Sequence, residues 1–266
     1  MILHHSIKKK EINELYKKLI SPYFENKGFN FWKFTQRKDN YRVLNFKTPK
    51  SWRKIYFKLY PRLRQINLKG IITKENKLFS IIQKRKSTRE FTGRCLSLDT
   101  ISKILYFSSG IRNFGEINDN FDKSLRMYPS AGARYPLEVY PVILKSKEIS
   151  VGIYHYNVKW NTLELLLKGD FRKKFGKITG QNWVENSAVI IIITAVFPRT
   201  IVKYKERGWR YIFFEVGHLT QNIQLIATML RLKSCPIGDF IDQEIISLLD
   251  LNSKSELPLY LLAIGE

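Results

Sequence analysis

Residues 199–240, RTIVKYKERGWRYIFFEVGHLTQNIQLIATMLRLKSCPIGDF, contain the pattern that decides the fold. After a basic and aromatic lead-in, apolar residues recur at intervals of three and four, which predicts one long helix with a continuous apolar face. The residues on that face are Trp209, Ile212, Phe213, Val216, Leu219, Ile223, Ile226, Ala227 and Leu230, with Phe214, Leu225 and Met229 beside it. Because the helix is this apolar, we expect it to be buried, with the rest of the fold packed around it.

Both ends of the predicted helix carry residues that suit a binding site. Lys203 and Tyr204 precede it, and Pro236–Asp239 follows it as a tight apolar turn. The glycine at position 238 would let a flat ligand approach the backbone closely. An apolar stripe is more commonly explained by core packing alone, so the evidence for a binding site in this stretch comes from the residues at its two ends.

The composition is that of a folded protein with a full core. Of 266 residues, 44% are hydrophobic and 14% aromatic, which fits one large domain or one domain with an extension. The longest apolar run, residues 188–197, is too short to span a bilayer, and no signal-peptide pattern opens the chain. We therefore expect a cytoplasmic protein without a membrane partner.

Cysteine and histidine are too few and too scattered for a metal centre. The chain has 2 Cys and 4 His, without CxxC spacing, which predicts neither a disulfide framework nor a zinc site. Redox chemistry would therefore need a bound organic cofactor.

The positive charge is concentrated in the first third of the chain. Residues 1–90 contain 24 Lys or Arg and 6 Asp or Glu, whereas residues 91–266 contain 22 and 17. A basic segment rich in aromatic residues suits an acidic peptide, a partner protein or nucleic acid. A generally lysine-rich composition explains it equally well. Because no nucleic-acid-binding motif is present, we expect no nucleic-acid partner.

The remaining pattern predicts an α+β fold whose central sheet is mostly antiparallel and flanked by helices. Residues 1–75 are interpreted as a basic, aromatic extension, helical at 8–20 and irregular from 23 to 70, and residues 76–266 as the main domain. Further helices are predicted at 75–86, from Ser97 to Gly110, at 171–178 and at 242–249. Strands are predicted from residue 137, at 151–156 and 161–167 as a hairpin, at 188–197 as a central strand buried on both faces, and at 259–264.

Three short segments have the chemistry of a site for a flat, phosphorylated ligand. Arg85, Ser87 and Arg89 alternate just beyond a predicted helix, so their side chains share one face of an extended segment and suit a phosphate. Residues 130–132 and 236–238 offer backbone donors without bulky side chains. Each signal is weak alone, because basic runs at helix ends usually meet solvent and each glycine segment is also explained as a turn.

In this order, the segments resemble the FMN-dependent nitroreductase superfamily, and within it the SagB-type branch of azoline (thiazoline or oxazoline) dehydrogenases. The matching segments, which span residues 85–265, are RKSTREF, YPSAGARYPLEVY, GIYHYN, VKYKERGWRY, GHLTQN, CPIGDF and LYLLAIG. The resemblance implies a nitroreductase-like α+β fold that forms a homodimer with FMN at the subunit interface.

The resemblance also implies which residues hold the cofactor. It places Arg85, Ser87 and Arg89 at the FMN phosphate and ribityl chain. The residues that it places along the isoalloxazine are Pro129, Ser130, Ala131, Gly132, Pro236, Ile237, Gly238 and Asp239. Arg134 departs from the branch, which commonly has a small or apolar residue there, and a guanidinium at this position would narrow or recharge the substrate pocket.

Azoline dehydrogenases carry a Lys-Tyr pair that Lys203 and Tyr204 match. Aromatising an azoline removes a hydride, which flavin N5 accepts, and a proton from the neighbouring carbon, which needs a base. Lys203 is expected to be that base, provided that burial or nearby cations favour its neutral form, and Tyr204 to relay the proton or position the ring. The alternative is that Lys203 is a solvated loop lysine and that Tyr204 only packs its ring.

The leading expectation is thus an FMN-dependent dehydrogenase that oxidises azolines to azoles in a precursor peptide during the maturation of a ribosomally made peptide natural product. Its expected partner is a cyclodehydratase complex. One alternative is an NAD(P)H-dependent nitro or quinone reductase that uses the same flavin site, against which the Lys-Tyr pair argues. Another is a non-catalytic subunit that binds flavin or peptide within a modification complex.

Overall fold

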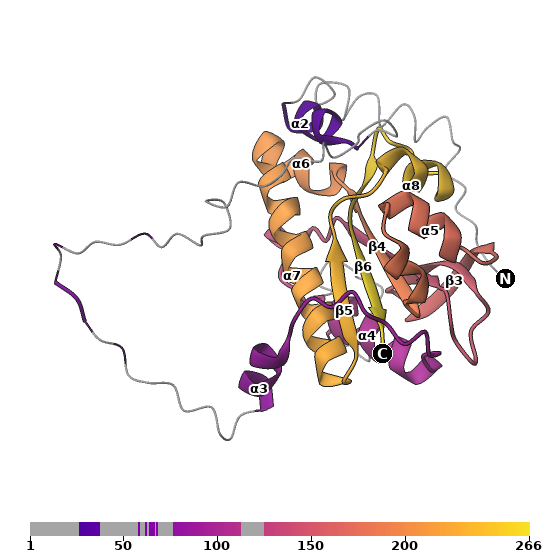
Figure 1. The fold of residues 1–266 in the computed structure, drawn as a ribbon. Helices are drawn as coiled ribbons and strands as arrows, with labels where there is room; N and C mark the ends of the chain where they lie inside the picture. Colours follow the sequence, from indigo (N-terminus) through magenta and orange to yellow (C-terminus); the bar gives the residue numbers. More distant parts are fainter. Residues whose placement is uncertain are drawn as a thin grey trace, which may run out of the picture.

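The computed structural model describes residues 27–37, 58, 62, 64–66, 68, 77–112 and 125–266, and its centre is one six-stranded sheet (Figure 1). The strands are β1 (Leu137–Ile143), β2 (Gly152–Asn157), β3 (Thr162–Lys168), β4 (Val189–Val196), β5 (Lys233–Ile237) and β6 (Glu256–Gly265). Their order is β3-β2-β1-β4-β6-β5, and every neighbouring pair is antiparallel. The predicted α+β fold with an antiparallel sheet, its hairpin and its central strand are confirmed.

Helices cover both faces of this sheet. They are α2 (Lys27–Thr35), α3 (Lys77–Lys84), α4 (Leu98–Ser109), α5 (Arg172–Thr179), α6 (Pro198–Tyr204), α7 (Gly208–Met229) and α8 (Asp242–Leu248), with short 3-10 turns at Ala131–Ala133, Asn182–Asn186 and Lys205–Arg207. The predicted cap of α4 is present, since Ser97 Oγ accepts the Thr100 N–H at 3.2 Å. Among the described residues, no helix has the length and apolar character needed to cross a membrane.

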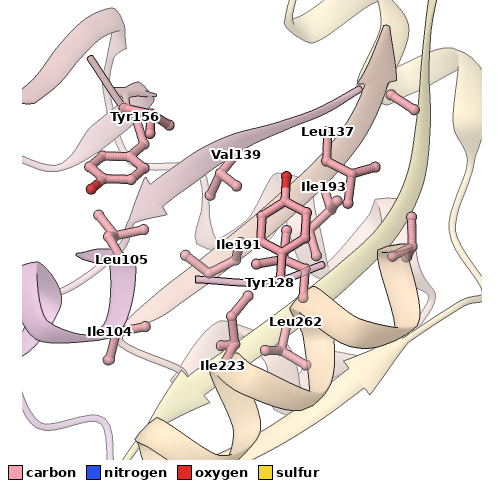
Figure 2. Packing of buried hydrophobic residues seen from close by; sticks show 14 of the residues in the cluster. Ile104, Leu105, Tyr128, Leu137, Val139, Tyr156, Ile191, Ile193, Ile223 and Leu262 are labelled. Atoms are coloured by element: carbon pink, nitrogen blue, oxygen red, sulfur yellow. The ribbon is translucent and has the colours of Figure 1, made fainter. Parts of the chain in front are cut away.

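The core consists of two apolar clusters, one on each face of the sheet. In β4, Ile190 and Ile192 point into the cluster formed with α5 and α8, whereas Ile191 and Ile193 point into the cluster formed with α4 and α7. Alternation along a strand produces this division, because successive side chains point to opposite faces. Figure 2 shows the α4–α7 side, where the sheet meets the side chain of Ile223.

The expectation that α7 is buried all round is wrong. Its predicted inner residues, such as Ile212 and Leu219, are buried, but Phe213 is 40% exposed and Phe214 58% exposed. Met229 is exposed as well. Helix α7 therefore has an outward apolar face in addition to its inward one, because its apolar residues are too many for a single face against the sheet.

Two local expectations around α7 also differ from the structure. The basic lead-in is itself helical and forms α6 before the 3-10 turn Lys205–Arg207. The segment that was expected to be a turn is in part a strand, since Pro236 and Ile237 belong to β5 at the edge of the sheet. Proline is tolerated there because an edge strand leaves one side without ladder hydrogen bonds.

The N-terminal extension contributes one described helix. Residues 27–35 were expected to be irregular but form α2, which packs on α7: a side chain on Gly28 would overlap the Trp209 ring. Tertiary packing outweighs weak local propensity here. The helix expected at 8–20 lies outside the described residues, and the loop expected at 111–127 is described only at its ends, where Ile111 pairs with Arg126. The division at residue 75 stays a prediction.

Candidate functional site

The basic segment Arg85–Arg89 runs beside the start of β5. Ser87 forms a parallel bridge with Ser234, and the Thr88 N–H donates to the Ser234 carbonyl at 2.9 Å. The Arg89 guanidinium lies close enough to Cys235 to lower the pKa of that thiol, although burial has the larger, raising effect. The structure thus brings two of the three predicted site segments together along one strand.

The guanidinium groups of this segment are available to a ligand. Arg85 is partly buried and Arg89 exposed. Among the described residues, neither forms an ion pair with a carboxylate, whereas the nearby Arg94 pairs with Glu266 at 3.2 Å. Two unpaired guanidinium groups on one short segment suit a doubly charged phosphate.

At the other end of β5, the backbone of Gly238 borders a cavity of about 1060 Å³. The cavity wall includes Phe31 of α2, Phe213 of α7 and Asp239. A β-carbon on Gly238 would meet only the Tyr260 ring, at 3.6 Å, so packing within the chain does not require glycine there. This size and apolar character are typical of a small-molecule site.

The extension reaches this same cavity through Arg37. Its Nη1 lies 3.2 Å from Asp239 Oδ1, and its backbone N–H donates to Asp242 Oδ2 at 3.1 Å. Burial raises the pKa of Asp242 to about 6, against the lowering effect of the Arg37 N–H. A segment far away in sequence therefore helps to fix the predicted site residue Asp239.

The second group of predicted residues meets at Gly132. A β-carbon on Gly132 would overlap Tyr204 Oη and lie 2.9 Å from Lys203 Nζ. Lys203 Nζ stands 5.3 Å from the centre of the Tyr204 ring, and that ring packs edge-on against Tyr211 at 5.0 Å. The predicted catalytic pair and the predicted isoalloxazine-binding loop are therefore in direct contact.

The backbone on both sides of this contact has an unusual conformation. Gly132, Ala133 and Tyr135 have φ angles of 60°, 52° and 44°, and Lys205, directly after Tyr204, has φ 50° with ψ −140°. Positive φ is costly for residues other than glycine and is concentrated at functional sites, where surrounding contacts enforce it. Arg134 supplies one such contact, since its Nε donates to the Arg199 carbonyl of α6 at 2.8 Å.

A buried carboxyl group supports the same loop from α7. Glu215 is 2% exposed, and its Oε1 accepts the Ala131 N–H at 3.1 Å, while its Oε2 has no partner among the described residues. Burial raises the pKa of Glu215 to about 7, despite the lowering effects of Ala131, of Ser130 and of the Arg126 charge. A carboxyl group that titrates near neutral pH is typical of functional sites.

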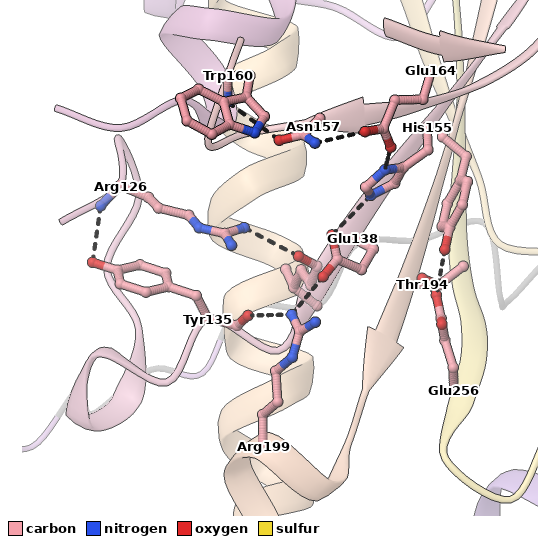
Figure 3. A network of polar contacts seen from close by, with 12 residues as sticks. Arg126, Tyr135, Glu138, His155, Asn157, Trp160, Glu164, Thr194, Arg199 and Glu256 are labelled. Atoms are coloured by element: carbon pink, nitrogen blue, oxygen red, sulfur yellow. Dashed lines mark hydrogen bonds and ion pairs between the residues drawn. The ribbon is translucent and has the colours of Figure 1, made fainter. Parts of the chain in front are cut away.

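An ionic network fixes the start of α6, as Figure 3 shows. Arg199 pairs with Glu138 of β1 at 2.5 Å and donates to the Tyr135 carbonyl at 3.2 Å. His155 of β2 lies between Glu138, at 3.2 Å, and Glu164, at 2.8 Å. Burial lowers the pKa of His155, but its hydrogen bonds to Glu138 and Glu164 outweigh this effect, so that the pKa is raised. Burial raises the pKa of Glu138, but His155 and Arg199 outweigh this effect, so that the pKa is lowered.

The predicted site residues thus form two groups within the chain. One joins Arg85–Arg89 to the β5 residues, and the other joins Pro129–Gly132 to Lys203 and Tyr204. Among the described residues, no hydrogen bond or ion pair connects the two groups. Lys203 is exposed and Tyr204 partly buried in the single chain.

Sequence reasoning missed two residues of the site. Glu215 lies beside Leu219 at the edge of the apolar face on the helical wheel, so it was visible in the sequence as a charged residue bordering that face. Arg37 gave no such signal, because its contact with Asp242 joins residues 205 positions apart.

Comparisons with known proteins place the chain in a family. The model of the family described as "Nitroreductase family" matches residues 82–266. The Methanocaldococcus jannaschii protein "Putative nitroreductase MJ1384" is 32% identical over 192 residues, which cover 72% of this chain and 91% of that protein. The Escherichia coli microcin B17-processing protein McbC is 24% identical over 177 residues, or 64% of this chain and 62% of McbC.

A solved structure has a similar fold. A chain of the E. coli microcin synthetase McbBCD complex with truncated pro-MccB17 bound superposes with a TM-score of 0.72 at 20% identity, covering 98% of both chains. The resemblance inferred from the motifs is confirmed: the chain belongs to the nitroreductase family.

Proposed function

We propose that this protein is an FMN-dependent dehydrogenase that oxidises thiazolines or oxazolines in a precursor peptide to thiazoles or oxazoles. The observation that carries this proposal is the contact of Gly132 with Lys203 Nζ and Tyr204 Oη, because it unites a flavin-binding loop with a candidate base. The similarity to McbC, which is named as a peptide-processing protein, supports the choice of a peptide substrate.

The residues present fit FMN. Arg85 and Arg89, unpaired with carboxylates and separated by the hydroxyl of Ser87, suit the phosphate and the ribityl chain. The open face of Gly238, where no internal contact requires the missing side chain, suits a ring lying against the backbone. Pro129–Gly132 would bind the ring from the other group of residues. When bound, FMN supplies the hydride acceptor.

The chain supplies the proton acceptor for the reaction. Oxidation of an azoline removes a hydride from one ring carbon and a proton from its neighbour, so that a second ring double bond forms. Lys203 Nζ in its neutral form would take that proton, and Tyr204, whose hydroxyl lies against Gly132, would relay it or orient the azoline. The strained backbone at Lys205 and in the Gly132 loop keeps both side chains in place.

A homodimer would complete the site. Among the described residues the two groups share no direct hydrogen bond or ion pair, and a second copy would allow one group from each chain to meet around one flavin. Exposed apolar side chains that a second copy would cover are Phe213 and Phe214 near the start of α7, and Phe79 and Ile82 on α3. Gly217, which has no atom within 4 Å of its missing side chain, leaves room for close approach there.

A cyclodehydratase is the partner that the chemistry requires, because azolines must be formed from Cys, Ser or Thr side chains before they can be oxidised. The relative with 98% coverage belongs to a synthetase complex with a truncated pro-peptide bound. The basic aromatic extension, whose helix α2 borders the Gly238 cavity, is a suitable element for holding peptide or partner.

A second candidate is an NAD(P)H-dependent nitro or quinone reductase. The 32% identity to the M. jannaschii protein favours it. A third candidate is a subunit that binds flavin or peptide at the same site but has no activity, because its proton acceptor does not function.

One experiment separates these candidates. Purified protein is incubated with FMN, oxygen and a heterocyclised peptide, and azole formation is followed by the loss of two mass units per ring. The proposed dehydrogenase oxidises the rings without NAD(P)H. Consumption of NAD(P)H with nitroaromatics, and no azole formation with or without a cyclodehydratase, would establish the reductase instead. Absence of both activities with intact flavin binding would leave the non-catalytic subunit.

A further inference from the structure

We propose that Glu215 is a positioning residue for the oxidation: its carboxyl group fixes Ala131, and through Gly132 it sets the position of Lys203 and Tyr204. This inference rests on the proposed function. It assigns a role to a buried acid that neither touches the predicted flavin-binding segments of β5 nor belongs to the predicted catalytic pair.

The first step of the argument is the direct contact. Glu215 Oε1 accepts the Ala131 N–H at 3.1 Å, and the Ser130 side chain lies close enough to lower the pKa of the carboxyl group, although burial has the larger, raising effect. The Ser130 hydroxyl oxygen accepts the Tyr135 N–H at 2.8 Å. Glu215 therefore holds the turn at Ala131, and Ser130 holds it at Tyr135; Gly132 and Ala133, which lie between these two contacts, have positive φ angles.

The second step is the cost of keeping this group in the core. Glu215 is 2% exposed, and Oε2 makes no hydrogen bond among the described residues. Burying a carboxyl group with an unsatisfied oxygen is unfavourable for stability, and an apolar residue would fill this position at lower cost. A role in the loop explains the presence of the acid, whereas core packing does not.

The third step is the relay to the catalytic pair. Ala131 directly precedes Gly132. Gly132 lies so close to Tyr204 Oη and Lys203 Nζ that no side chain would fit at its position. A shift of the loop by a fraction of an ångström would therefore displace both side chains. Misplacement of about 1 Å can lower a catalytic rate by roughly 10²-fold.

Oε1 can accept the Ala131 N–H in either protonation state of Glu215, but the ionised carboxylate accepts it more strongly. The groups that act on it from the preceding segment are Arg126 and Tyr128. On α7 the titratable residues one turn away are Tyr211 and His218, and α6 brings Lys203 and Tyr204 against Gly132. Burial outweighs the Arg126 charge and raises the pKa of Glu215 to about 7, so protonation near neutral pH weakens the hydrogen bond to Ala131 without removing it.

The first test follows the Ala131 amide by NMR in protein labelled with ¹⁵N-alanine and free of flavin. Its chemical shift is expected to titrate near pH 7 in the wild type and to lose that titration in Glu215→Gln. Thr220→Val is the matched control, because Thr220 is a buried α7 residue whose hydroxyl also has no partner among the described residues. An Ala131 amide that does not titrate, or titrates alike in Glu215→Gln, would overturn the proposal.

The second test measures azole formation with the flavin-loaded protein between pH 5.5 and 9. Glu215→Ala is expected to lower kcat by roughly 10–10²-fold with little change in KM, and Glu215→Gln, which can still accept from Ala131, to recover most of the rate while losing the step near pH 7. Unchanged kcat and pH profile in both variants would contradict the proposal. If Glu215→Ala does not fold, Glu215→Gln decides. If the wild type forms no azoles, the proposed function fails, and the amide titration alone decides whether Glu215 holds the loop.

Discussion

Gly132 and Tyr204 lie so close together that no side chain fits between them: a β-carbon on Gly132 would overlap Tyr204 Oη and approach Lys203 Nζ to 2.9 Å. Two segments about 70 positions apart in the sequence are thereby fixed against each other. The contact places an amine and a phenol beside the Gly132 loop, so a substrate bound at this loop would lie within reach of both.

Gly132→Ala should lower azole formation strongly, because the added methyl group pushes Tyr204 and Lys203 aside. The φ angle of 60° should add a loss of roughly 1–2 kcal/mol in the free energy of unfolding. Gly169→Ala is the control, since Gly169 also has positive φ but its nearest neighbour is the Phe171 ring at 3.7 Å. It should lose stability and keep its rate; a Gly132→Ala protein that keeps its rate as well would show that the contact is not used.

Arg85→Ala and Arg89→Ala should each weaken FMN binding by roughly 1.5–3 kcal/mol, the contribution of a charge-assisted hydrogen bond. Titration with FMN, followed by flavin fluorescence, measures the change, and FMN rather than FAD should be released on denaturation. Arg94→Ala is a matched control, because Arg94 is exposed in the same region but pairs with Glu266. Equal affinity in all three variants would place the phosphate elsewhere.

Glu215 should make stability depend on pH. Burial raises its pKa from the ordinary 4.5 to about 7, so folding favours the protonated form. The stabilisation is complete below about pH 4.5 and is lost as the pH rises through 7, which amounts to roughly 2–3 kcal/mol. Urea titrations at pH 5 and pH 8 should therefore show a smaller pH difference in Glu215→Gln than in the wild type.

The residues Asp242 and His155, whose pKa values are also raised, titrate in both proteins, so the comparison isolates Glu215. Thr220→Val should shift stability equally at the two pH values. An identical pH difference in the wild type and Glu215→Gln would mean that the carboxyl group is not perturbed by folding.

The outward face of α7 should mediate dimer formation. Wild-type protein should sediment as a dimer at micromolar concentration, and Phe214→Lys should shift it towards monomer and weaken FMN binding at the same time. Trp160→Lys changes an equally exposed aromatic residue in the β2–β3 turn and should do neither. A monomeric wild type that binds FMN tightly would refute the shared site.

The elements whose pattern is local could be predicted from the sequence. The apolar periodicity of α7, the alternation in the β2–β3 hairpin and the continuous apolar run of β4 each reflect how one segment meets the core. The sequence could not reveal that Phe213 and Phe214 face outward, because apolar periodicity does not distinguish a buried helix face from an exposed apolar one. Helix α2 was missed because it depends on contacts with Trp209.

The same division applies to the site. Candidate residues could be named because glycine, arginine and lysine at those spacings match a known family, and their binding of FMN stays a prediction; their arrangement could not be derived from the sequence. Which segments meet is a property of tertiary structure: Gly132 with Lys203, and Ser87 with Ser234. Arg37 was beyond prediction, since its contacts with Asp239 and Asp242 depend on how the extension folds back.

The central claim, that Lys203 accepts the substrate proton, is tested most directly by the rate of azole formation in Lys203→Ala on a heterocyclised peptide with oxygen present. The account predicts a loss of roughly 10²–10⁴-fold with an unchanged flavin spectrum. Lys203→Arg should be as inactive, because a guanidinium keeps the charge but does not release its proton. Tyr204→Phe should retain more activity if the phenol only positions the ring. Near wild-type azole formation by Lys203→Ala would contradict the account.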